Sequence, residues 1–95
     1  MTSPTISRQK RIYQLREMLE TLERVTPAGR YSVAETIVRT LRGEALDPDI
    51  QFRPSQRQTV VRSLDDLEHQ MSQGVPEPDA FDRKAQILID VFAVV

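Results

Sequence analysis

The segment 81–95 constrains the fold more than any other part of the chain. Nine of the eleven residues from Ala85 to Val95 are apolar, and only Gln86 and Asp90 interrupt them. A segment this apolar is not stable when it is exposed to water. We therefore expect it to be the central element of the core, part of an interface with another chain, or both.

Helical periodicity favours a helix for this segment. Its apolar residues recur at spacings of four and three, as on one face of a helix, at Phe81, Ala85, Leu88, Phe92 and Val95. A strand over 86–95 is the alternative, because β-branched residues are common in sheets. A strand needs partners, and only 50–52 resembles a second one, so we prefer the helix. A membrane span is not expected, since the run is shorter than roughly 20 residues and contains Asp90.

Amphipathic patterns predict three helices before this segment. The first covers 4–25 and begins at Ser3-Pro4 or at Ser7, because serine followed by proline is typical of a helix start. The third covers 55–73. Their apolar stripes are Ile12, Leu15, Leu19 and Leu22 in the first helix, and Val60, Leu64, Leu67 and Met71 in the third.

The second helix is predicted to be short, over 33–42. Ser32 and Glu35 have the spacing of a capping box, and Gly43 is a suitable residue to follow a helix end. A helix of this length is marginal alone, so it must pack on the others.

The predicted fold is all-α, a small antiparallel four-helix bundle with a short second helix. Its last helix covers 80–93 with Asp79 as the cap, and residues 1–95 form a single helical domain. The connector before the third helix carries three apolar residues that we expect to pack over the end of the bundle, at Leu46, Ile50 and Phe52.

Charge is distributed unevenly, although the net charge is only −1. Four bases and no acid lie within the first sixteen residues, at Arg8, Lys10, Arg11 and Arg16. Helices normally carry acids early and bases late, whereas the first and third helices here show the reverse. Three explanations remain open. The charges are screened by solvent, the two helices pair antiparallel within the monomer or across a dimer, or the four bases contact an acidic partner or phosphates.

No catalytic or metal-binding pattern is present in the sequence. There is no cysteine, and His69 with Asp65 one turn earlier is a pair of ligands rather than a site. A calcium loop starting at Asp47 fails, because Phe52 and Gln58 stand where glycine and an acid are needed. We expect no enzyme activity, no cofactor, no metal and no small-molecule substrate. With no apolar signal segment near the start, the expected location is the cytoplasm.

Two functions are compatible with this pattern. The preferred one is a protein-binding module, such as an adaptor, secretion chaperone, immunity or inhibitor protein, or phage-type regulator. It acts through apolar residues of the last helix that bind another protein or a second copy, namely Ile87, Ile89, Val91, Val94 and Val95. The alternative is a dimeric DNA-binding regulator that uses the four early bases. The loop at 26–31 allows a helix-turn-helix, but the outward residues of its second helix offer little for base contacts.

Overall fold

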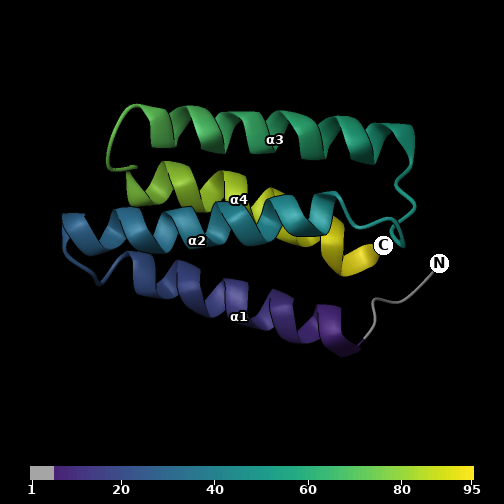
Figure 1. The fold of residues 1–95 in the computed structure, drawn as a ribbon, viewed down its shortest axis with the longest axis horizontal. Coiled ribbons are helices and arrows are strands. Elements are labelled where there is room, and N and C mark those ends of the chain that lie inside the picture. The colour runs from purple at the N-terminus through teal and green to yellow at the C-terminus, as the bar shows by residue number, and fades with distance from the viewer. Residues whose placement is uncertain (1–5) are drawn as a thin grey trace.

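The computed structural model describes residues 6–95, which form four α-helices and no strand. Their bounds are α1 (Ile6–Leu22), α2 (Pro27–Ala45), α3 (Pro54–Ser72) and α4 (Pro78–Val94). Consecutive helices run antiparallel, so α1 and α3 begin at the end of the bundle where α2 and α4 finish (Figure 1). The predicted all-α antiparallel bundle is confirmed. The alternative strand over 86–95 is wrong, because α4 continues to Val94.

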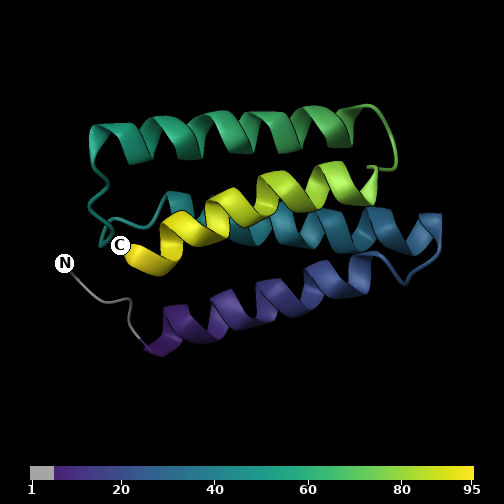
Figure 2. The same ribbon diagram turned by 180° about the vertical axis from the view of Figure 1, so that it is seen from behind.

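The bundle is flattened, with α2 and α4 in the middle and α1 and α3 at the two edges. Within the described helices, α1 and α3 each contact both α2 and α4 but not each other, and α2 meets α4 across the centre. α2 lies in front in Figure 1, and α4 lies in front in Figure 2. The principal dimensions are 39 × 24 × 18 Å. α4 therefore has three helical neighbours that shield it from water.

One hydrophobic core connects the four helices. The predicted stripe of α4 is buried in it at Phe81, Ala85, Leu88 and Phe92, while Val95 is half-buried. The stripe of α1 is buried as well, at Ile12, Leu15, Leu19 and Leu22. In α3, Val60 and Leu67 are buried, and Leu64 and Met71 are partly buried against the core. Burial of these side chains is the main favourable contribution to folding.

The second helix is not short. α2 begins at Pro27, six residues before the predicted start, and is 19 residues long. The Thr26 hydroxyl caps it by accepting a hydrogen bond from the Gly29 amide at 3.4 Å, and proline at the first helical position has no amide hydrogen that needs a partner. Ser32 lies inside α2, so the predicted capping box is wrong, and Gly43 does not end the helix.

Other helix ends differ by a few residues from the prediction. α1 ends at Leu22 rather than near Val25. α3 begins at Pro54, one residue before the predicted 55, and Gly74, with φ 118°, follows its end in a conformation that favours glycine. The expected start at Ser3-Pro4 lies outside the described residues.

The cap of α4 is Glu77 instead of Asp79. The Glu77 carboxylate accepts hydrogen bonds from the amides of Asp79 and Ala80 at 3.3 and 2.8 Å. Pro78 follows the cap, so the helix starts two residues before the predicted position.

The connector between α2 and α3 is fixed by two of its three predicted anchors. Ile50 is buried, and the ring of Phe52 lies 6.0 Å from that of Phe92 in α4. The Arg57 guanidinium lies over the Phe52 ring at 5.5 Å, a distance at which cation and ring attract. Leu46 is 75% exposed, so its prediction as an anchor is wrong.

We expect Leu88→Ala to lower the free energy of unfolding by about 2–5 kcal/mol, because the side chain is fully buried and its truncation leaves a cavity. Urea unfolding followed by circular dichroism measures the change. Val61→Ala in α3 is the control, since this side chain is half exposed and should change stability by less than about 0.5 kcal/mol. Equal small effects of both variants would show that α4 is not the centre of the core.

Candidate functional site

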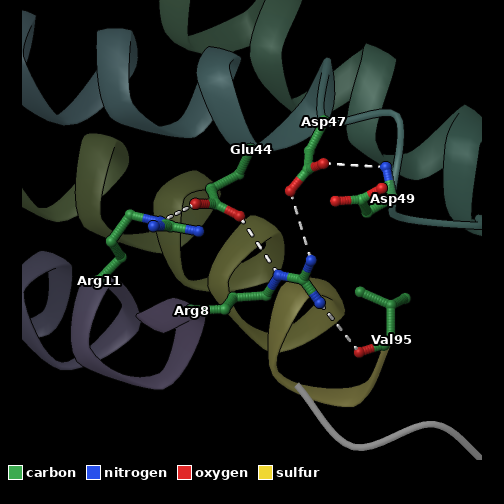
Figure 3. Close-up of polar contacts among 6 residues, drawn as sticks. All are labelled: Arg8, Arg11, Glu44, Asp47, Asp49 and Val95. Atoms are coloured by element: carbon green, nitrogen blue, oxygen red, sulfur yellow. Dashed lines mark hydrogen bonds and ion pairs between the residues drawn. The ribbon is translucent and has the colours of Figure 1, made fainter. Parts of the chain in front are cut away.

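Charged side chains from three parts of the chain meet at the end of the bundle where α1 begins. They come from α1, from the last turn of α2 and from the connector that follows it, and they lie beside the end of α4 (Figure 3). The antiparallel order of the helices brings these segments together, since α1 starts where α2 and α4 finish. We call this group, which consists of Arg8, Arg11, Glu44 and Asp47, the ion network.

Glu44 is the buried centre of the ion network. Its side chain is only 5% exposed, and two arginines of α1 approach it, with Arg8 Nε 3.4 Å from Oε2 and Arg11 Nε donating to Oε1. A carboxylate removed from water without a partner costs several kcal/mol. The two guanidinium groups offset that cost, so the position of Glu44 depends on α1.

Arg8 extends the ion network to the connector and to α4. One of its terminal nitrogens lies 3.4 Å from Oδ2 of Asp47, and the other donates to the backbone oxygen of Val95 at 3.5 Å. Asp47 in turn accepts a hydrogen bond at Oδ1 from the Asp49 amide at 2.9 Å, which closes a local turn. A cation beside the last carbonyls of a helix is also favoured by the helix dipole. Arg8 therefore links the start of α1 to the end of α4.

The ion network explains part of the reversed charge of α1. The early bases Arg8 and Arg11 are stabilised by acids of α2 and the connector, and Arg16 lies 3.7 Å from Asp90 of α4. A pairing of the first and third helices within the monomer is wrong, because α1 and α3 do not contact each other.

The reversed charge of α3 has a similar origin. Its late acid Asp66 lies 3.0 Å from Nζ of Lys84 in α4, and Glu68 pairs with Arg42 of α2. Exposed pairs of this kind contribute at most about 1 kcal/mol each. These pairs help to fix the register between neighbouring helices, and they are not part of the hydrophobic core.

The four predicted basic contact residues are therefore not equivalent. Arg8 is buried beside Glu44 and Asp47, so it is not the free surface base that was predicted. Arg11 and Arg16 have acidic partners within the chain. Lys10 is exposed and forms no ion pair with any residue from 6 to 95.

The predicted apolar contact residues of α4 are divided between the core and the surface. Ile89 is fully buried, because neighbouring helices cover that side of α4, so it cannot belong to an exposed surface. Ile87 and Val94 are exposed, at 39% and 52%, and Val91 between them is half-buried against the core. At spacings of four and three, these residues lie along one side of α4. We call Ile87, Val91 and Val94 the apolar strip.

The apolar strip leads to a pocket of about 720 Å³ at the same end of the bundle. Ile50, Val94 and Val95 supply its apolar surface, and Arg8 of the ion network borders it. Arg8, from the predicted basic group, and Val94 and Val95, from the predicted apolar group, therefore line the same pocket. The lining is completed by polar residues of the connector and of the start of α3, namely Asp49, Gln51, Arg53 and Gln56. We call this the end pocket. Apart from the apolar residues of the connector, no pattern in the sequence indicated that the connector would line it.

Residues 6–95 hold neither a metal-binding cluster nor a membrane-spanning helix. No three metal-binding side chains lie close enough together to hold an ion, and His69 is exposed. None of the four helices combines the length and the apolar character needed to cross a membrane.

We expect Glu44→Gln to lower the free energy of unfolding by about 3–5 kcal/mol, because it removes the charge that compensates buried Arg8. The matched control is Glu35→Gln, which breaks an exposed ion pair with Arg39 and should cost less than about 0.5 kcal/mol. Urea unfolding of both variants gives the comparison. Similar small losses would mean that the ion network contributes little to stability.

Comparison of the chain with models of known protein families, with curated proteins and with solved structures found no match.

Proposed function

We propose that this protein is a non-enzymatic cytoplasmic binding module that holds a segment of another protein at the end pocket and along the apolar strip. The observation that carries the proposal is the convergence of Val94, Val95 and Ile50 on one concave surface beside exposed apolar residues of α4. Within this class, an adaptor, chaperone, inhibitor or small regulator would each use such a surface.

The chemistry of the surface suits a peptide segment with an apolar anchor. Apolar side chains line part of the end pocket, while Arg53, Gln51 and Gln56 supply donors and acceptors around them. Binding sites commonly combine a mainly apolar lining with a few polar groups that fix orientation, in volumes of about 300–1,000 Å³. An apolar side chain of the partner would lie against Val94 and Val95, and its backbone would bond to the polar groups.

The ion network supports this proposal because it holds the walls of the end pocket in place. Arg8 is tied to Glu44 and Asp47, and it also bonds to the backbone of Val95. A surface that is already ordered loses less conformational entropy when it binds. The buried charges thus favour a preformed site over one that orders only in the complex.

The charge arrangement also favours a protein partner over DNA. Three of the four early bases, Arg8, Arg11 and Arg16, lie beside acids of the same chain. Affinity for DNA rests mainly on lysine and arginine side chains that neutralise phosphates and so release counterions. Bases already paired with carboxylates contribute little to that release.

We expect Val94→Asp to weaken partner binding about tenfold or more, because it places a charge where an apolar side chain should pack. Val61→Asp is the matched control, since Val61 of α3 is a valine with nearly the same exposure, 51% against 52%, and does not line the end pocket. Both variants keep their fold if their circular dichroism and melting temperatures match the parent protein.

The measurement has two stages. Immobilised parent protein and both variants are first compared for the proteins they retain from an extract of the source organism, by quantitative mass spectrometry. Proteins lost only with Val94→Asp are then purified, and their affinities are measured by calorimetry. A partner retained equally by Val94→Asp would show that the end pocket is not the binding site.

A further inference from the structure

A second surface feature lies on α1, on the side that faces away from the bundle. The buried residues of α1 lie on one side of the helix, and a stripe at spacings of four, three and four occupies the opposite side. We call this the outer stripe, and it consists of Ile6, Lys10, Tyr13 and Glu17. Two of its side chains are among the most exposed large hydrophobic residues of the described chain, Ile6 at 74% and Tyr13 at 64%.

The outer stripe carries charges that the bundle does not explain. Lys10 lies near the start of α1 and Glu17 lies two turns later, the reverse of what the helix dipole favours. Neither side chain forms an ion pair with another residue from 6 to 95. Arg8 and Arg11 pair with Glu44 of the same chain. Lys10 and Glu17, which face away from the bundle, have no such acid or base beside them in the described part of the chain.

We propose that two copies of this chain associate through α1, with their outer stripes antiparallel about a twofold axis between Tyr13 and Gln14. In this arrangement Lys10 of each copy faces Glu17 of the other, so one contact pair is formed twice. The two Tyr13 rings meet near the axis, together with the adjoining Gln14 side chains, and extend the contact with apolar area. This inference is independent of the end pocket, which stays open to another partner.

Charge complementarity selects the antiparallel orientation. A parallel pair of outer stripes would place Lys10 against Lys10 and Glu17 against Glu17, and like charges in close contact repel each other. The antiparallel pair replaces both repulsions with two attractions. Hydrogen bonding and charge interaction with Glu17 raise the pKa of Tyr13, so the two side chains are neighbours on the stripe. The Glu17 carboxylate has a second oxygen with which to bind Lys10 of the other copy.

The size of the outer stripe sets the expected strength. One face of a 17-residue helix offers less area than the roughly 1,600 Å² of a standard protein interface. The dimer is therefore weak and reversible, and it depends on the charged contacts. Because exposed charges are screened by salt, association should be stronger in dilute buffer than at physiological ionic strength.

Charge exchange tests this arrangement without disturbing the core, since both charged residues are exposed. Sedimentation velocity from micromolar to millimolar protein, in dilute buffer, measures the weight-average mass of each variant. Lys10→Glu should abolish the rise in mass with concentration, because it leaves only acids at the contact. Lys10→Glu combined with Glu17→Lys restores opposite charges across the axis, so self-association should return.

The location is tested by a charge reversal on another helix. Arg83→Glu changes an exposed base of α4 and should leave the association of the parent protein unchanged. Three results would overturn the inference: a parent protein that stays monomeric at every concentration, a double exchange that fails to restore association, or an equal loss with Arg83→Glu. The last result would show that self-association depends on net charge rather than on the outer stripe. Each of these results leaves the test of the end pocket unaffected, because that test measures binding to a different protein.

Discussion

Removal of α4 from water is the interaction on which the other features of this molecule depend. Its buried residues include two phenylalanines, Phe81 and Phe92, as well as Leu88 and Ile89. α1, α2 and α3 all contact this helix, which places α1 and α3 at the edges of the bundle and leaves them apart from each other. The antiparallel order then brings the start of α1 and the ends of α2 and α4 to a common end. The ion network and the end pocket exist because of that geometry.

At this common end, buried charge and apolar surface depend on each other. Glu44 is stable in the interior because Arg8 and Arg11 approach it from α1. Arg8 also bonds to the connector and to the end of α4, so the same side chain borders the end pocket and joins its walls. Buried ion pairs often contribute less to stability than apolar residues of the same size would. Their benefit here is positional, because they hold four segments in one arrangement around a concave surface.

The outer surface of the bundle is divided between two proposals that use different residues. The end pocket and the apolar strip lie at the end of the bundle and along α4, and they suit a segment of a different protein. The outer stripe lies on α1 and carries opposite charges in an order that is complementary to itself. Because the residues do not overlap, both contacts can form in the same molecule. A weak dimer would present two end pockets and so raise the effective affinity for a partner with two binding segments.

Local patterns in the sequence determined the helical class, the four elements and most of the core, because apolar spacing reports which face of a helix avoids water. They failed where a choice depended on neighbours. The start of α2 is a local exception, because Thr26 and Pro27 form its cap and first position while the pattern at Ser32 offered a competing cap. Ile89 and Ile87 have similar sequence surroundings, yet the adjacent helices cover only the first. Arg8 looked like a free surface base until folding placed Glu44 beside it. Burial and ion pairing join residues far apart in the chain, so they are properties of the tertiary structure, whereas helix formation is largely a property of neighbouring residues.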